Sequence, residues 1–179
     1  MKVIGERVSI LKKEAVLSVV ILPTTDNKKL ALMFAWLMAW TVCGLLVLAN
    51  YFKLTQQDAK LFIIGYLSFW AYYEFKIMRS FIWKKWGKEK IWIQEGVLHY
   101  KREVNGKGKI REFNVELVNE LRLIEVKQGN FSDFINQSFW VKGGERLEFD
   151  FMAKNIRFGM QLSTEEAKTV LGELKSRMS

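Results

Sequence analysis

The chain has 179 residues, which is room for one small domain beside membrane segments but not for two full domains. Half of the residues are hydrophobic and 26% are charged, with a formal net charge of +9. The single cysteine, Cys43, excludes an intramolecular disulfide and a cysteine-based metal centre, and the single histidine, His99, excludes a multi-histidine metal site, so we expect no metal and no cofactor.

Residues 1–27 predict a β-hairpin rather than a cleavable signal peptide. The apolar run before Pro23 is short and lacks a small-residue cleavage site. Val8 and Ile10 alternate with polar neighbours, and residues 15–22 are rich in valine and isoleucine, as strands are. Pro23 ends the second strand because it has no N–H to donate to a ladder.

Residues 30–52 form an uninterrupted apolar stretch, LALMFAWLMAWTVCGLLVLANYF, with lysines on both sides. About twenty apolar residues in a helix, at roughly 1.5 Å each, cover the ~30 Å hydrocarbon core of a bilayer. The alternative is the core helix of a soluble protein, but so small a chain would have to surround a long rod that is apolar all round. This stretch therefore predicts a membrane span.

Small side chains recur at every fourth residue of this span, which places them in one line along a helix face: Ala31, Ala35, Ala39 and Cys43. Such a line lets another helix approach closely. The stripe predicts a helix-packing seam, either with a second span of the same chain, which we favour, or with a second copy of the chain in a homo-oligomer.

A second span is predicted at residues 61–83, so that residues 28–86 form a two-helix transmembrane hairpin with a short polar connector. Its second half contains Glu74, Lys76 and Arg79. Counted from the start of this span, Glu74 lies about 20 Å along the helix, towards the inner boundary of the membrane. Adjacent cations and lipid headgroups then account for its charge, and a proton or ion role is the alternative.

Basic residues beside the two spans predict the orientation of the chain. Lysines precede the first span and follow the second, whereas the connector has two lysines and one aspartate. The positive-inside rule then predicts a multi-pass protein of the cytoplasmic (inner) membrane with both termini in the cytoplasm.

After the spans the sequence changes to a period of two with frequent turn signals, and residues 87–179 predict a mainly β domain. Asn105-Gly106 is its strongest hairpin signal. Strands are expected near residues 90–94, 97–104, 109–115, 120–127, 139–141, 147–151 and 156–160. Residues 163–178 predict an amphipathic helix that begins with a capping box formed by Ser163 and Glu166.

The chain resembles the small bacterial membrane proteins that combine a two-span hairpin with a pleckstrin-homology-like (PH-like) domain. The resemblance is in the hairpin and in the segments KEKIWIQEGVLHYKREVNGKGKIREFNV and RLEFDFMAKNIRFGMQLSTEEAKTVLGEL. It implies a PH-like antiparallel curved sheet or barrel capped by one C-terminal helix, with the strands before the first span in the same sheet. It brings no residue-level active site, and the fold alone does not imply a ligand.

The sequence disfavours an enzyme. The nucleophile-elbow, P-loop, dinucleotide-binding and zincin motifs do not occur. His99 lies in an alternating strand pattern, where a histidine is usually an outward polar residue. The glycines that follow Asn105 are explained by a hairpin turn rather than by a phosphate-binding loop.

Two functions from different classes are therefore considered. The first is a membrane-anchored module for protein interaction or scaffolding at the cytoplasmic face, with Phe131 and Phe134 of the loop 129–138 as candidate partner contacts. The second is a domain that senses anionic lipid headgroups at the membrane surface. Its candidate contacts are Lys84, Lys85, Lys88 and Lys90, for which a purely topogenic role is an equal alternative.

Other partners are less favoured. An accessory subunit of a transporter is a weaker alternative, because two spans are too few for a transport pathway. The net positive charge is also typical of nucleic-acid binding, but a domain tethered beside a membrane is not expected to bind nucleic acid.

Overall fold

The structure is a computed structural model that describes residues 2–4, 6–23, 26–124 and 144–178. The chain divides into two compact units. Met1–Thr25 and Trp83–Ser179 together form one of them, called the sheet unit here, and Asp26–Ile82 forms the other, called the helical unit. The helical unit is thus an insertion within the sequence of the sheet unit.

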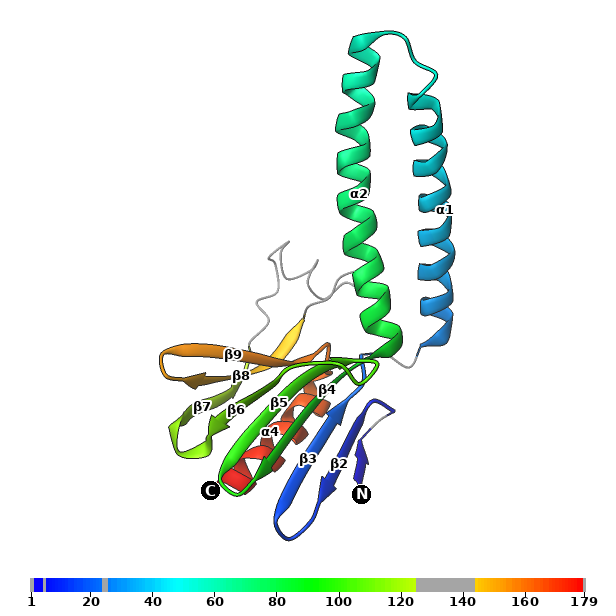
Figure 1. The fold of residues 1–179 in the computed structure, drawn as a ribbon. Helices are drawn as coiled ribbons and strands as arrows, with labels where there is room; N and C mark the ends of the chain where they lie inside the picture. Colours follow the sequence, from blue (N-terminus) through cyan, green and yellow to red (C-terminus); the bar gives the residue numbers. More distant parts are fainter. Residues whose placement is uncertain (1, 5, 24–25, 125–143, 179) are drawn as a thin grey trace. The chain divides into compact units, whose positions relative to one another are not determined.

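The helical unit contains α1 (Asn27–Tyr51) and most of α2 (Gln57–Trp86). The carboxylate of Asp26 caps α1 by accepting a hydrogen bond from the backbone N–H of Lys29 at 3.0 Å, and this bond lowers the pKa of Asp26. The two helices run antiparallel (Figure 1), and the rings of Phe34 on α1 and Phe81 on α2 lie 5.7 Å apart between centroids.

A glycine sets the close approach of the two helices. A Cβ on Gly44 would lie 2.0 Å from Cε2 of Trp70, so this position of α1 has room only for glycine. The indole Nε1 of Trp70 donates a hydrogen bond to the carbonyl oxygen of Trp40 at 3.1 Å. The predicted seam lies elsewhere: Ala31, Ala35, Ala39 and Cys43 are all exposed. The favoured interpretation of that stripe, packing against the second helix of the same chain, is therefore wrong.

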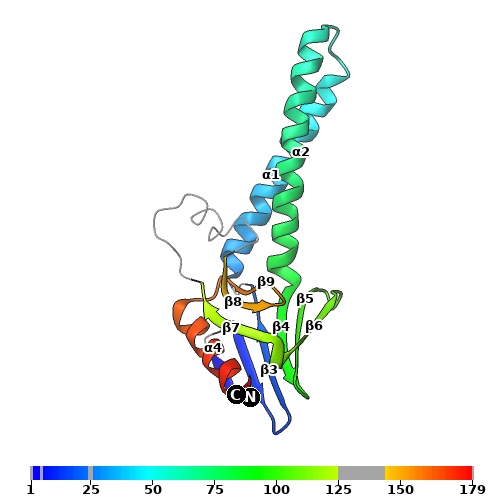
Figure 2. The same cartoon turned by 90° about the vertical axis from the view of Figure 1, so that its left-hand side faces the viewer.

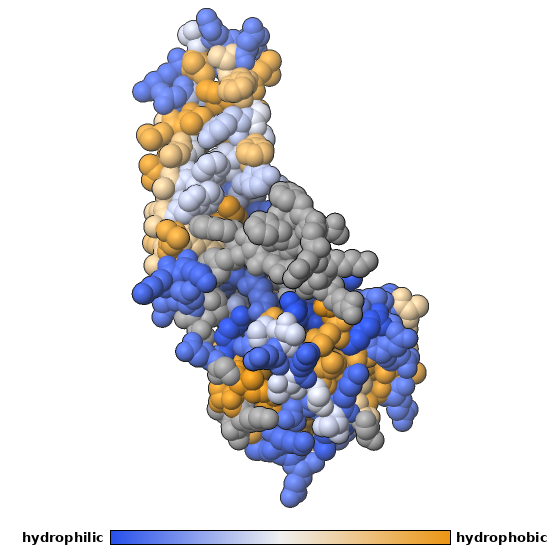
Figure 3. Space-filling model, turned by 180° about the vertical axis from the view of Figure 1, so that it is seen from behind, coloured by the Kyte–Doolittle hydropathy of each residue, from blue (hydrophilic) through white to orange (hydrophobic). Residues whose placement is uncertain are grey.

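Among the described residues, α1 is the one helix that is long and apolar enough to cross a membrane, and 17% of its most apolar window is buried. Apolar side chains are exposed along the helical unit (Figure 3). The longer helix α2 does not meet the same criterion, because its second half carries Glu74, Lys76 and Arg79. The prediction of two apolar spans is thus met by α1 alone.

Six antiparallel strands form the larger sheet, sheet A, in chain order: β1 (Lys2–Ile4), β2 (Val8–Lys12), β3 (Val16–Ile21), β4 (Gly87–Gln94), β5 (Val97–Val104) and β6 (Ile110–Asn114). β3 pairs with β4 across the inserted helical unit, with Leu17 opposite Ile93 and Ile21 opposite Glu89 (Figure 1). The strands before α1 and those after α2 are therefore neighbours in one sheet.

A smaller sheet, sheet B, contains β7 (Val118–Leu123), β8 (Glu145–Phe151) and β9 (Lys154–Met160). The 3-10 helix η1 (Val115–Leu117) leads from β6 into β7. The chain ends in α4 (Thr164–Met178), which lies against β3, β7 and β8 (Figure 2). Its capping box is present, since Ser163 N–H donates to Glu166 at 2.8 Å and Glu166 N–H donates to the Ser163 hydroxyl at 3.1 Å.

Both sheets and α4 share one hydrophobic core, which includes Leu17, Ile91, Phe149, Phe158 and Val170. The fold class is therefore a mixture of helices and antiparallel sheets with a C-terminal helix. Of the two expected forms, a curved sheet or a barrel, a closed barrel is not formed, because among the described strands no backbone ladder joins sheet A to sheet B. The turn of η1 interrupts the chain between the two sheets, and side chains bridge them instead.

Candidate functional site

The carboxylate of Glu89 on β4 bridges the two sheets from within the core, where its side chain is 1% exposed. One oxygen accepts hydrogen bonds from Tyr100 Oη at 2.7 Å and Arg102 Nε at 2.8 Å. The other accepts from the backbone N–H groups of Gly159 and Met160, both at 2.9 Å. These two N–H groups lie on the edge strand β9, so Glu89 takes the place of a neighbouring strand.

The charge of Glu89 also controls the protonation of its neighbours. Burial and the negative charge of Glu89 both raise the pKa of Tyr100, so the phenol keeps its proton and donates it. Burial alone would lower the pKa of Arg102, but Glu89, together with Tyr100 and Glu145, more than offsets this, and the net shift is upward. With four donors on one carboxylate, this cluster is suited to holding the sheets together rather than to transferring protons.

A second group of polar contacts lies at the end of β9. Arg7, between β1 and β2, donates to the carbonyl oxygens of Met160 at 3.1 Å and Gln161 at 3.0 Å. Lys84 Nζ, in the last turn of α2, donates to the side-chain oxygen of Gln161 at 2.9 Å. Burial lowers the pKa of Arg7, which the nearby Glu166 partly counteracts. These contacts fasten segments that are far apart in the sequence onto the same strand end.

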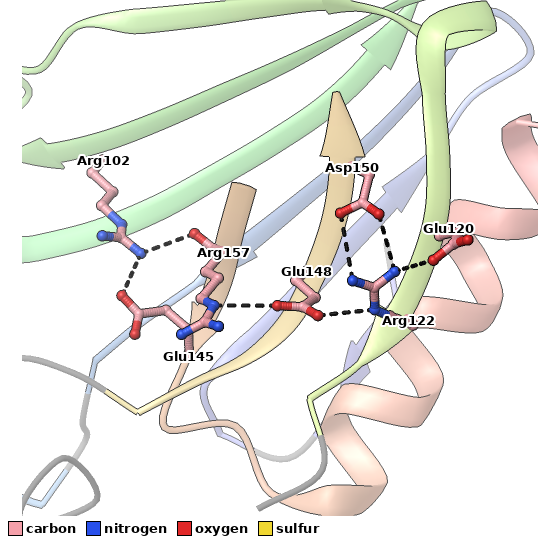
Figure 4. A network of polar contacts seen from close by, with 7 residues as sticks. All are labelled: Arg102, Glu120, Arg122, Glu145, Glu148, Asp150 and Arg157. Atoms are coloured by element: carbon pink, nitrogen blue, oxygen red, sulfur yellow. Dashed lines mark hydrogen bonds and ion pairs between the residues drawn. The ribbon is translucent and has the colours of Figure 1, made fainter. Parts of the chain in front are cut away.

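Alternating charges cover the outer face of sheet B (Figure 4). Arg122 on β7 pairs with Glu148 at 2.9 Å and with Asp150 at 3.2 Å, and also contacts Glu120. Arg157 on β9 pairs with Glu148 from the other side at 3.2 Å. The hydrogen bonds that Arg122 donates to the two carboxylates of β8, Asp150 and Glu148, raise its pKa. Two guanidiniums face three carboxylates here, so most of the charge is paired within the network and an excess of one negative charge remains.

Three lysines converge on one carboxylate on the outer face of sheet A. Lys90 and Lys101 each lie 2.7 Å from Glu103, and Lys88 lies 3.2 Å from it. Hydrogen bonds from Lys101 and Lys90 lower the pKa of Glu103 to about 2. Three ammonium groups against one carboxylate leave an excess of two positive charges, and β4 begins directly after α2. This group is called the lysine cluster below.

The structure separates the four lysines predicted to contact lipid. Lys84 is 3% exposed and bound to Gln161, which removes it from the surface. Lys85 is exposed and lies over the ring of Trp86 at 4.7 Å. Lys88 and Lys90 belong to the lysine cluster, which also contains Lys101.

Apolar side chains lie beside the lysine cluster on the same face of sheet A. The ring of Trp92 stacks on that of His99, with centroids 4.9 Å apart and planes 9° apart. His99 also lies 3.6 Å from Glu112 on the neighbouring strand. Leu11 and Ile110, which point to the same face by register, are exposed. This face is called the outer face of sheet A below.

The predicted partner contacts belong to the loop 129–138. Phe131 and Phe134, the candidate partner contacts, lie outside the described residues, as does the strand expected at 139–141.

A hollow of ≈ 440 Å³ lies where the β4–β5 turn meets the end of α4. Its described lining is Ala15, Ile93, Glu95, Gly96, Val115, Arg177 and Met178. It is large enough for a small ligand but has no convergent set of polar groups.

A polar contact joins the two helices of the helical unit. The hydroxyl Oγ1 of Thr41 lies 2.7 Å from Oε1 of Glu74 and 2.8 Å from the carbonyl oxygen of Leu37. The sequence placed Glu74 near the inner end of its span. The structure places it opposite Thr41, the middle residue of the span predicted over residues 30–52.

Comparison of the chain with family models, curated proteins and solved structures gives no match. Within the part of the chain that the structure describes, no group of three or more His, Cys, Asp or Glu side chains is placed to hold a metal ion. Three features are therefore the candidates for a binding or functional site: the lysine cluster, the outer face of sheet A and the Thr41–Glu74 pair.

Sequence reasoning missed Glu89, Glu103 and Arg102. A signal for Glu89 exists in the segment Gly87–Gln94, because Glu89 has the same parity as Ile91 and Ile93 and must share their face. An acidic residue in phase with core positions indicates a buried, bonded carboxylate. Its partners on β9 are distant in sequence and have no local signal.

Proposed function

We propose that the chain is a membrane-anchored interaction module of PH-like fold. In this proposal α1 and α2 form a two-helix hairpin in the inner membrane of a bacterium, and the sheet unit is a protein-interaction domain at its cytoplasmic face. The observation that carries the proposal is α1, a helix of 25 residues whose apolar side chains are exposed rather than packed in a core. Exposure of such an apolar surface to water is unfavourable, and contact with lipid acyl chains would avoid that exposure.

The pairing of β3 with β4 supports a hairpin rather than a single span. Because both strands belong to one sheet, the chain must leave and re-enter the sheet unit on the same side of any membrane that α1 crosses. The second helix then has to return through the bilayer. Apart from Asp58 and Lys60 in its first turn, the charged residues of this helix lie in its second half, and one of them, Glu74, has a polar partner on α1.

Extraction and topology mapping test this anchor. Membranes are washed with alkaline carbonate, and reporter fusions are placed at each terminus and in the connector near Gln56. We expect the chain to stay in the pellet, with both termini cytoplasmic and the connector outside. Release of the intact chain into the wash, or termini on opposite sides, would contradict the proposal.

The outer face of sheet A is the proposed contact surface for a protein partner. It combines the Trp92–His99 stack with exposed Leu11 and Ile110, a mixture of aromatic and aliphatic groups that is typical of interface centres. Cross-linking and mass spectrometry in native membranes should identify a specific neighbour that Trp92→Ala loses. The matched control is Met152→Ala, which removes an exposed apolar side chain from the β8–β9 turn. Identical neighbours for both variants would exclude this face.

The same cross-linking and mass-spectrometry experiment tests the predicted partner loop. Phe131→Ala combined with Phe134→Ala should reduce recovery of the neighbour if the loop contributes contacts. Unchanged recovery, with Trp92→Ala still effective, assigns the interaction to the sheet alone.

The lysine cluster favours a second function, contact with anionic lipid headgroups. Lys88 is two residues beyond Trp86, within roughly 7 Å along a strand of the end of α2, so a membrane hairpin would bring the cluster near the headgroups. The test is lipid enrichment around the full-length protein in mixed bilayers, read by native mass spectrometry. Lys88→Gln/Lys90→Gln should reduce enrichment of anionic lipid, whereas Lys107→Gln/Lys109→Gln, in an exposed turn, should not. Equal enrichment in both variants would exclude the cluster.

A further inference from the structure

The Thr41–Glu74 contact is a polar site inside the helical unit. Thr41 is the middle residue of the apolar stretch 30–52, and the sequence has no Asp, Glu, Lys or Arg between Lys29 and Lys53. A single carboxyl group therefore faces a helix that supplies no counter-charge. Polar and ionisable residues at such depth are rare and costly unless they serve a function.

The hydrogen atoms at this site do not balance if Glu74 is a carboxylate. The Thr41 hydroxyl has one hydrogen, yet two acceptors lie within bonding distance: the Leu37 carbonyl oxygen at 2.8 Å and Glu74 Oε1 at 2.7 Å. A threonine within a helix commonly donates to the carbonyl oxygen four residues earlier, which here is that of Leu37. A bare oxygen–oxygen contact at 2.7 Å would then remain, and it becomes a hydrogen bond only if Glu74 is the donor.

The surroundings of Glu74 do not supply another compensation. Its second oxygen, Oε2, is buried and has no hydrogen-bond partner among the described residues. Lys76, the nearest cation in sequence, lies over the ring of Tyr72 at 5.7 Å. From α1 the facing side chain is the hydroxyl of Thr41, and Trp70, one turn before Glu74, is bonded to the backbone of Trp40. A carboxylic acid satisfies this environment better than an ion does.

We propose that Glu74 is a proton-binding site in the membrane. It holds a proton that it donates to Thr41 Oγ1, while Thr41 donates its own hydrogen to Leu37. The ligand is the proton itself, and the site rests on the proposed location of the helical unit in a bilayer. The neutral acid is also the form of a carboxyl group that reacts with an apolar carbodiimide dissolved in the lipid.

Labelling with dicyclohexylcarbodiimide tests the site in native membranes containing the full-length chain. The carboxyl proton moves to a carbodiimide nitrogen, the carboxyl oxygen adds to the central carbon, and an acyl shift leaves a stable N-acylurea. We expect peptide mass spectrometry to find the adduct on Glu74 and to find it lost in Glu74→Gln. A water-soluble carbodiimide with an added amine serves as control and should label exposed carboxylates such as Glu116 instead.

Infrared spectroscopy of the reconstituted protein provides a readout that does not depend on reagent access. A protonated carboxyl gives a carbonyl stretch that moves in D₂O and disappears in Glu74→Gln, whose amide can still donate to Thr41. In Thr41→Val the band should persist and move to higher wavenumber, because the acid has lost its acceptor. Absence of the band in the wild type overturns the proposal, and an unmoved band in Thr41→Val overturns the pairing.

Carbonate extraction of the same membranes separates the two levels of the inference. If the chain is retained but Glu74 is neither labelled nor visible as an acid, the proton site fails and the anchor stands. If the chain is released, the anchor fails first and the site fails with it.

Discussion

Replacing Glu89 tests whether a side chain, rather than a ladder, holds the two sheets together. Glu89→Gln keeps the volume, and one amide oxygen can still accept from Gly159 and Met160. The amide nitrogen, however, would face Arg102 Nε, which is also a donor. Breaking a buried, hydrogen-bonded ion pair costs about 3–5 kcal/mol. Because Arg102 keeps Glu145 at 2.9 Å, we expect the lower part of that range for the glutamine.

Glu89→Ala removes all four bonds, and we expect it to reach the upper part of the range or to prevent folding. The assay is chemical unfolding of the full-length protein in detergent, followed by near-ultraviolet circular dichroism. Hydrogen exchange at Gly159 and Met160 gives a local readout, which should accelerate in Glu89→Ala and much less in Glu89→Gln. The matched control is Glu14→Gln, on an exposed turn, which should stay within about 0.5 kcal/mol of wild type. A Glu89→Gln variant as stable as this control would refute the reasoning.

Four further substitutions have definite expectations. Pairing with lysines lowers the pKa of Glu103 from its ordinary value of 4.5 to about 2. The carboxylate therefore stabilises the fold fully above pH 4.5, and this stabilisation is lost as the pH falls from 4.5 towards 2. The melting temperature of Glu103→Gln should accordingly depend less on pH between these two values than that of the wild type. Gly44→Ala should destabilise the helix pair by about 1–3 kcal/mol, because the added methyl group would clash with the ring of Trp70. Gly65→Ala, which has open space around it, should be neutral or stabilise the helix by up to about 1 kcal/mol. Thermal unfolding in detergent compares the two variants. Ser163→Ala should cost about 1 kcal/mol by removing the cap of α4, as measured by chemical unfolding.

Features with a local cause were predictable from the sequence. The hairpin signal Asn105-Gly106 requires positive φ at both residues, and the structure gives 49° and 77°. The capping box of α4 depends on two residues three positions apart, and both of its bonds are present. The strand expected at 97–104 is present as β5, because the alternation of apolar and polar residues within one segment is enough to predict a strand.

Features that depend on distant partners were not predictable. The alanine stripe of α1 satisfied a packing motif, but the motif does not say which neighbour it meets, and the bulk of Trp70 placed the contact at Gly44 instead. Closure of a barrel depends on pairing between strands far apart in the chain, for which alternation carries no information. The lysine cluster likewise arises from register, since Lys88 lies opposite Glu103 and Lys90 opposite Lys101 only once β4 and β5 are paired.

The β3–β4 pairing has a consequence for biosynthesis. The ribosome completes β3 well before it reaches β4, because the whole of α1 and α2 is translated in between. At about 5–20 residues per second, the nascent hairpin waits for several seconds with an unpaired strand edge. If the helices enter a membrane as proposed, their delivery to the insertion machinery falls within the folding of the sheet, and a delay in insertion would prolong the aggregation-prone interval of the N-terminal strands.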